Sequence, residues 1–112
     1  MNASRLIVGL SGPELTSEEK SLFREIQPAG YILFSRNLVS AEQIRGLTDS
    51  LNSISQHRPF ISIDQEGGRV WRTREFSCAP PDAATFSKKA TPRQIAQFGA
   101  LTGQLLQILG IN

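Results

Sequence analysis

Three short apolar runs, separated by segments of helical periodicity, restrict what this chain of 112 residues can fold into. We expect them to form strands at residues 6–10, 31–34 and 60–63, and a further strand to begin at Ile111. The runs are rich in β-branched and aromatic residues and are nearly continuous rather than alternating. That pattern is typical of strands covered on both faces, as in parallel sheets. The sequence therefore predicts an α/β fold with parallel strands.

Each helical segment opens with a hydroxyl residue that is followed three positions later by Glu or Gln. These pairs are Thr16 with Glu19, Ser40 with Gln43, and Thr91 with Gln94. Such a pair predicts a capping box, in which each side chain accepts a hydrogen bond from the other residue's backbone N–H. The expected order is β-α-β-α-β-α, with a long loop over residues 64–90 before the last helix.

An alternation of this kind builds either a (β/α)8 barrel or an open, doubly wound sheet. A barrel needs eight βα units and about 250 residues. This sequence supplies about three units and reaches Asn112 without a terminal signal. Under either interpretation, we expect an incomplete α/β domain.

Composition excludes several classes of function. Twelve basic and ten acidic residues leave a net charge of +2, which is too small to indicate a nucleic-acid or membrane partner. One cysteine and one histidine allow neither an internal disulfide nor a zinc site, and we expect no metal. Glycine-rich nucleotide-binding motifs are absent, so no cofactor is expected. No apolar stretch resembles a signal peptide or a membrane helix, so we expect a soluble, cytoplasmic protein.

Candidate site residues follow the third apolar run, because parallel α/β folds bind ligands at the carboxyl ends of their strands. Asp64 comes directly after that run and could accept hydrogen bonds from sugar hydroxyls or cap a turn; both interpretations remain open. Gly67 and Gly68 predict a tight turn with positive φ. Asp64 and Glu66 are too weakly linked by their spacing to be interpreted as the carboxylate pair of a glycosidase.

Three arginines follow within six residues, at positions 69, 72 and 74. A guanidinium offers a planar fork of donors that could clamp ligand oxygens, but solvated surface arginines are the commoner outcome. Trp71 lies among them and could stack on a sugar face. Its alternation with the arginines favours packing under the loop.

Two motifs now point to a family. The run A-G-Y-I-L-F-S-R-N at residues 29–37, followed by I-D-Q-E-G-G-R-V at residues 63–70, resembles the N-terminal barrel domain of glycoside hydrolase family 3. Within that family, the bacterial β-N-acetylhexosaminidase branch, which works in peptidoglycan recycling, is the most similar. The resemblance implies that residues 1–112 are an incomplete family 3 (β/α)8 barrel domain. It also implies a parent enzyme that hydrolyses terminal non-reducing β-N-acetylglucosaminyl linkages with retention, in a small saccharide or muropeptide. The oligomeric state is not indicated.

The same resemblance implies that Asp64 and Arg72 bind hydroxyls of the non-reducing-end sugar. The family's nucleophilic aspartate, its acid/base histidine and its K-H-F-P-G-H-G segment are not in this sequence and are expected beyond residue 112, so this chain alone should be inactive. Residues 76–81 depart from the family pattern, as does Trp71, where a polar residue is common. A β-glucosidase-type member of the family and a non-catalytic sugar-binding remnant remain as alternatives.

Overall fold

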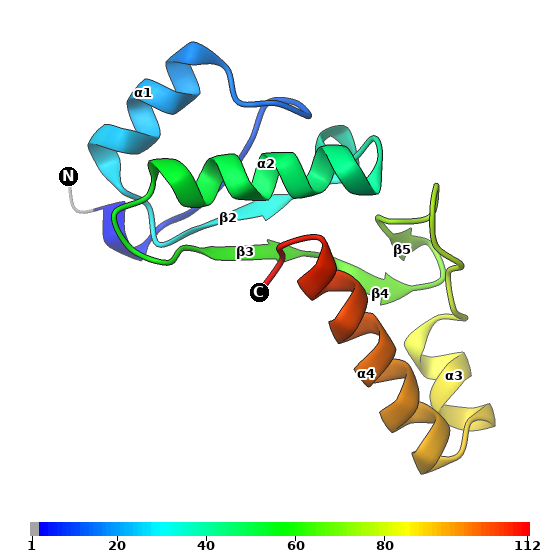
Figure 1. The fold of residues 1–112 in the computed structure, drawn as a ribbon. Coiled ribbons are helices and arrows are strands. Elements are labelled where there is room, and N and C mark those ends of the chain that lie inside the picture. Colours follow the sequence, from blue (N-terminus) through cyan, green and yellow to red (C-terminus); the bar gives the residue numbers. More distant parts are fainter. Residues whose placement is uncertain (1–2) are drawn as a thin grey trace.

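The computed structural model describes residues 3–112, in which three parallel strands form a sheet in sequence order (Figure 1). The strands are β1 (Ile7–Gly9), β2 (Gly30–Leu33) and β3 (Phe60–Ile63). Their parallel pairing confirms the prediction, with β3 matching its expected bounds and the first two strands differing by one residue at their ends. β2 is the central strand. One helical connection joins β1 to β2, and a second joins β2 to β3.

Helices connect and follow these strands. They are α1 (Ser17–Ile26), α2 (Ala41–Ile54), α3 (Ala83–Lys89) and α4 (Pro92–Ile108), with one-turn 3-10 helices at Ala3–Arg5 and Ser35–Asn37. The capping boxes predicted at Thr16 and Thr91 are both present.

The capping box predicted at Ser40 is only half formed. The Ser40 side chain accepts from the backbone N–H of Gln43, but the Gln43 Oε1 accepts from Val39 N at 2.9 Å instead of from Ser40. The Gln43 side-chain nitrogen also donates to the carbonyls of Pro13 and Asn37. These nonlocal partners draw the side chain toward the loops that follow β1 and β2.

The hydrophobic core lies between the sheet and the helices on one face. Tyr31, Leu33 and Ile61 alternate along β2 and β3 and are fully buried. They pack with Phe23 of α1 and with the apolar stripe of α2, and the Phe23 and Tyr31 rings meet edge to face with centroids 5.3 Å apart. Truncating such a core residue to alanine typically costs about 2–5 kcal/mol.

The other face of the sheet differs from the prediction that the strands are covered on both sides. Ile7 and Phe60 lie in register with Gly30 and point away from the helices. Their side chains are 54% and 64% exposed. The apolar runs therefore give the sheet two apolar faces. Within residues 3–112, the helices cover one of these faces and leave the other exposed.

The predicted long loop over residues 64–90 contains regular structure, so that prediction is wrong. β4 (Gln65–Gly67) and β5 (Val70–Trp71) form an antiparallel hairpin directly after β3. Helix α3 follows, with the Asp82 side chain accepting from Thr85 N at 3.0 Å. These elements are too short for a hydrophobic period to be visible in the sequence.

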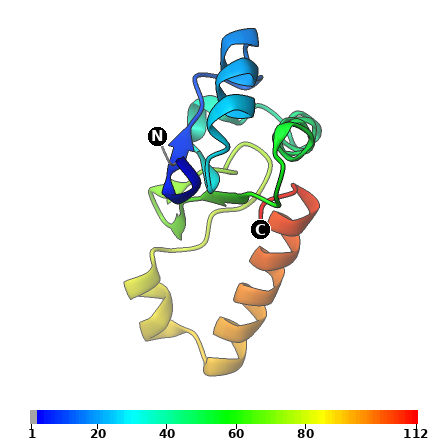
Figure 2. The same ribbon diagram turned by 90° about the vertical axis from the view of Figure 1, so that its left-hand side faces the viewer.

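Helix α4 has two different halves. Its carboxyl-terminal turn packs against α2, where Leu109 is buried and its carbonyl accepts from the Thr48 hydroxyl at 2.9 Å. Its first half extends with α3 away from the sheet (Figures 1 and 2). The chain then returns to β3, because Asn112 N donates to Ile61 O at 3.1 Å. The Asn112 side chain adds two bonds to the same segment, accepting from Ile61 N at 3.2 Å and donating to Pro59 O at 3.0 Å. Residues 111 and 112, where a further strand is predicted to begin, thus lie beside β3 but are not assigned as a strand.

Candidate functional site

Asp64 and Arg72 lie together at the carboxyl edge of the sheet. Asp64 follows β3 directly, and the β4–β5 hairpin turns the chain back so that Arg72 follows β5. Arg72 Nη2 lies 3.5 Å from Asp64 Oδ2, with the two side chains 27% and 41% exposed. This is a long, partly solvated ion pair, so both groups keep donor and acceptor positions for a ligand. The buried Nε of Arg72 has no hydrogen-bond partner within residues 3–112.

The hairpin turn depends on its two glycines. Gly67 and Gly68 have φ values of +88° and +56°, which confirms the predicted positive-φ turn. A Cβ on Gly67 would lie 2.6 Å from Pro81 O, and Gly68 N donates to Pro80 O at 2.8 Å. Residues 80 and 81 therefore pack directly against the turn. A side chain in place of either glycine would push the hairpin away from them.

A polar network inside the hairpin holds the backbone of Arg72. The Gln65 Oε1 accepts from Arg72 N at 2.6 Å, and the Gln65 Nε2 donates to Thr73 Oγ1 at 2.8 Å. The hydroxyls of Thr73 and Ser77 are 2.6 Å apart, and Trp71 Nε1 donates to Ser77 Oγ at 2.9 Å. Sequence reasoning missed the parts played by Gln65, Thr73 and Ser77, because no spacing signal marks such hydrogen bonds.

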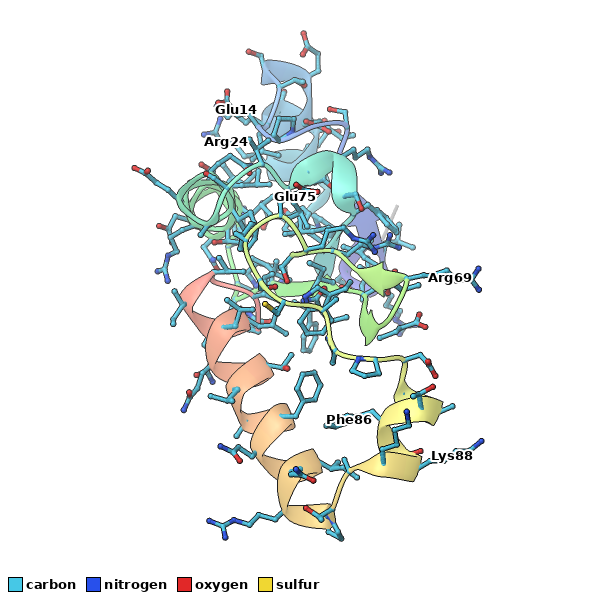
Figure 3. All side chains as sticks on the ribbon, turned by 90° about the vertical axis from the view of Figure 1, so that its right-hand side faces the viewer. Glu14, Arg24, Arg69, Glu75, Phe86 and Lys88 are labelled. Atoms are coloured by element: carbon cyan, nitrogen blue, oxygen red, sulfur yellow. The ribbon has the colours of Figure 1, made fainter. Side chains whose placement is uncertain are left out.

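Trp71 packs under the loop, as its alternation with the arginines favoured. Its side chain is 3% exposed, and its ring centroid lies 6.0 Å from that of Phe98 on α4. Phe98 in turn meets Phe86 of α3 edge to face at 5.2 Å, and Phe86 points from α3 toward α4 (Figure 3). The indole is thus occupied by protein on its ring and on its N–H, which leaves it unsuited to stack on a sugar.

The three arginines of the hairpin do not form one clamp. Arg69 is exposed and points outward from the hairpin (Figure 3). Arg74 folds back, donating from Nε to Trp71 O at 3.1 Å and from Nη2 to Arg69 O. Of the three, Arg72 is the one that the structure pairs with Asp64. The structure therefore agrees with the surface interpretation for Arg69 and gives Arg74 a structural role.

The loops after β1 and β2 are joined at the same edge by Arg36 and Asn37. Asn37 is fully buried; its side-chain nitrogen donates to Gly12 O at 2.8 Å and its Oδ1 accepts from Phe34 N at 2.8 Å. Arg36 Nε donates to Leu10 O at 2.7 Å. The R-N pair of the first motif therefore joins the loops that follow β1 and β2, with Asn37 buried and Arg36 exposed.

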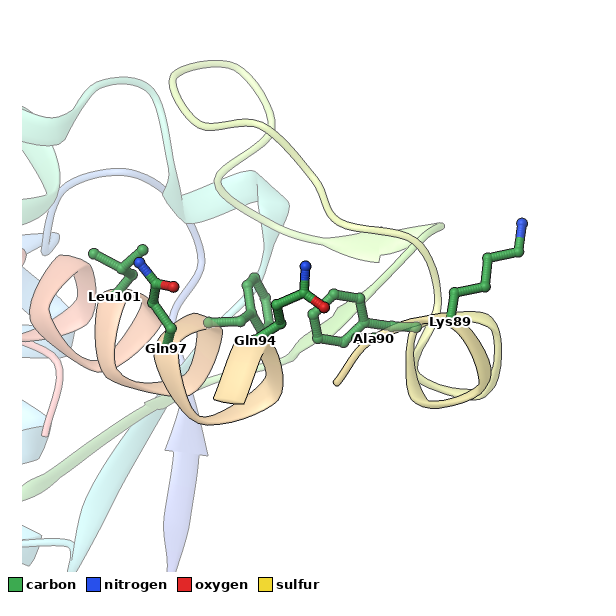
Figure 4. A pocket seen from close by; sticks show the side chains of 7 residues that line it. Lys89, Ala90, Gln94, Gln97 and Leu101 are labelled. Atoms are coloured by element: carbon green, nitrogen blue, oxygen red, sulfur yellow. The ribbon is translucent and has the colours of Figure 1, made fainter. Parts of the chain in front are cut away.

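Two apolar cavities lie beside the site but do not include it. One, of about 530 Å³, lies between the hairpin and the α3–α4 pair, and Glu66, Pro80 and Phe86 are among its lining residues. The other, of about 370 Å³, lies between α3 and α4 (Figure 4). Neither is lined by Asp64 or Arg72. Glu66 is exposed and lines the first of these cavities, which Asp64 does not line.

Within residues 3–112, no cluster of three or more His, Cys, Asp or Glu side chains has an arrangement that could hold a metal ion. No helix in that part of the chain is both long and apolar enough to cross a membrane.

Comparison with known proteins identifies the family. Residues 5–112 match the glycosyl hydrolase family 3 N-terminal domain. The chain belongs to glycoside hydrolase family 3.

Three similar proteins illustrate the match. A β-hexosaminidase of Alkalilimnicola ehrlichii is 49% identical over 70 residues, which are 62% of this chain and 20% of that protein. A family 3 β-N-acetylglucosaminidase from Paenibacillus superposes with a TM-score of 0.88 at 28% identity, covering 98% of this chain and 22% of that one.

The third is NagZ from Neisseria gonorrhoeae in complex with N-trifluoroacetyl-D-glucosamine, with a TM-score of 0.70 at 28% identity over 95% of this chain and 33% of that one. The family 3 chain described here therefore spans between a fifth and a third of the length of these relatives. Together with the parallel βα units, these matches confirm the expected fold class, the N-terminal part of a (β/α)8 barrel.

Proposed function

We propose that this chain forms part of the substrate pocket of a retaining β-N-acetylhexosaminidase, and that Asp64 and Arg72 bind hydroxyls of the terminal non-reducing sugar. The observation that carries the proposal is the pairing of these two side chains, 3.5 Å apart, at the carboxyl edge of a parallel sheet. That edge is where (β/α)8 enzymes bind their substrates.

The chemistry of the pair suits a sugar. A carboxylate accepts hydrogen bonds from two neighbouring hydroxyls, and a guanidinium donates to hydroxyl oxygens in a fixed plane. Hydrogen bonds to charged groups contribute about 1.5–3 kcal/mol each, enough to orient a sugar ring.

The relatives favour N-acetylglucosamine as the sugar. Several similar proteins are named β-hexosaminidases, and the solved NagZ complex holds N-trifluoroacetyl-D-glucosamine. We extend to this chain the role in peptidoglycan turnover, with a muropeptide substrate and a cytoplasmic location. The bonds themselves would be broken by other residues of the parent enzyme. A retaining carboxylate pair stands about 5–5.5 Å apart across the scissile bond, and here Glu66 faces a cavity that Asp64 does not line.

A titration of the ¹⁵N-labelled chain tests the proposal. N-acetylglucosamine should shift the backbone signals of Asp64 and Arg72 more strongly than an equal concentration of glucose. Asp64→Asn should weaken these shifts, whereas Arg69→Gln, a change in an exposed arginine of the same hairpin, should leave them unchanged. A preference for glucose would favour the β-glucosidase-type alternative. Shifts that do not involve Asp64 or Arg72 would contradict the site.

A further inference from the structure

We propose that Gln65 is a positioning residue that sets the location of Arg72 relative to Asp64, an inference that rests on the function proposed above. Gln65 stands between the two halves of the site. Its backbone follows Asp64 and pairs with Trp71 across the hairpin, and its side chain reaches one residue further to Arg72 N. The carboxamide thus continues the ladder past the end of β5, where the strand pairing has stopped.

Both ends of the carboxamide are used within the protein. The oxygen accepts from Arg72 N at 2.6 Å, and the nitrogen donates to Thr73 Oγ1 at 2.8 Å. Thr73 is fully buried and continues the network through Ser77 to the buried indole of Trp71. The Gln65 carboxamide thus bonds two successive residues after β5, as a residue that holds the hairpin would do.

The bond from Arg72 N to Gln65 fixes the backbone at residue 72, because the strand pairing of β4 with β5 ends at Trp71. The distance between Arg72 Nη2 and Asp64 Oδ2 is set by two backbone positions, residues 64 and 72, and the Gln65 side chain connects them across the hairpin. Replacing the carboxamide by the thioether of Met, a much weaker acceptor, removes the strong acceptor for Arg72 N–H and leaves the buried Thr73 hydroxyl with one partner fewer. A carboxylate would keep the acceptor, and the Thr73 hydroxyl proton could turn toward it.

The experiment compares Gln65→Met, Gln65→Glu and Gln104→Met in the 112-residue chain by amide hydrogen exchange. Gln104→Met is the matched control, because Gln104 is exposed on α4. In Gln65→Met the Arg72 amide should exchange roughly five- to tenfold faster, which corresponds to one lost hydrogen bond. In Gln65→Glu it should stay close to the wild-type rate. The Tyr31 amide of the central strand, which reports global opening, should change in neither variant.

Sugar binding provides a second readout of the position of Arg72. The N-acetylglucosamine-induced shift of the Arg72 Nε–Hε signal should weaken in Gln65→Met and recover in Gln65→Glu. A wild-type chain that binds no N-acetylglucosamine would contradict the proposed function, while the exchange rates would still decide the role of Gln65.

An unchanged Arg72 exchange rate in Gln65→Met overturns the inference, and so does equal acceleration at Tyr31. If Gln65→Met does not fold, Thr73→Val replaces it. That variant removes the far end of the network with little change of shape and should also speed exchange at Arg72; no change there would overturn the inference.

Discussion

Removal of the Asp64 carboxylate gives the most direct functional prediction. The assay requires a complete enzyme, so residues aligned with the β-hexosaminidase of Alkalilimnicola ehrlichii would replace the matching segment of that protein. In this chimera we expect Asp64→Ala to raise KM for a chromogenic β-N-acetylglucosaminide and to lower kcat/KM. The cause is the loss of a charged acceptor for the sugar hydroxyls.

The magnitude follows from the surroundings of the carboxylate. Hydrogen bonds to a charged group contribute about 1.5–3 kcal/mol, and 1.4 kcal/mol is a factor of ten, so kcat/KM should fall roughly ten- to hundredfold. The side chain is 41% exposed and its ion pair with Arg72 is long at 3.5 Å, which places the expected loss in the lower part of that range. Asp64→Asn keeps one acceptor oxygen and should lose less than Asp64→Ala.

Glu66→Gln is the matched control, since it alters an exposed carboxylate two residues away and should leave the kinetics close to those of the parent chimera. Two results would refute the reasoning. Unchanged kinetics in Asp64→Ala would remove Asp64 from the pocket. A loss of activity far beyond a hundredfold, with the fold retained, would make Asp64 a participant in bond cleavage rather than a ligand.

Four further predictions concern the chain itself. The 112-residue polypeptide should not hydrolyse a chromogenic β-N-acetylglucosaminide; turnover that disappears in Asp64→Asn would show otherwise. Gly110→Ala should destabilise the fold by about 2–4 kcal/mol in urea denaturation, because φ is +79° and a Cβ would collide with the Thr48 hydroxyl. Gly103→Ala, where a Cβ meets nothing within 4 Å, should instead stabilise it by about 0.5–1 kcal/mol. Burial raises the pKa of Glu19, but hydrogen bonds from the backbone of Thr16 and Ser11 outweigh it and hold the pKa below the ordinary 4.5. The stability that Glu19 contributes should therefore be present at neutral pH and lost as the pH falls below about 4.5. Denaturation at about pH 7 and about pH 3 should show less acid sensitivity in Glu19→Gln, and equal sensitivity would contradict this account.

Features governed by neighbours in sequence could be predicted. The strands follow from continuous apolar runs, and the caps at Thr16 and Thr91 follow from side chains three residues apart. The position of Asp64 at a strand end and the turn at Gly67 depend on local conformation, so the sequence was sufficient for them as well.

Features that depend on distant partners could not be predicted. The bonding of Gln43 to Pro13 joins residues far apart in the chain, so a local capping rule gave the wrong partner. The hairpin that returns Arg72 to Asp64 has a strand of two residues, in which no periodicity can be detected. The anchoring of Thr73 through Gln65 leaves no trace in composition or spacing.

The hydrogen-bond network of the hairpin lies within a short stretch of sequence, and this affects how the site can change between members of the family. Its hydrogen bonds begin at Gln65 and end at Ser77, so the pair formed by Asp64 and Arg72 is carried by one continuous stretch of chain. Of the residues 76–81 that depart from the family pattern, four (78–81) lie outside that stretch, whereas Ser77 is part of its network. Evolution could therefore rewrite the following segment, within the space that the glycine turn leaves for Pro80 and Pro81, without disturbing the ligand pair. Any exchange of residues 64–77 between family members would also have to keep the contacts of this stretch with Pro80, Pro81 and Phe98.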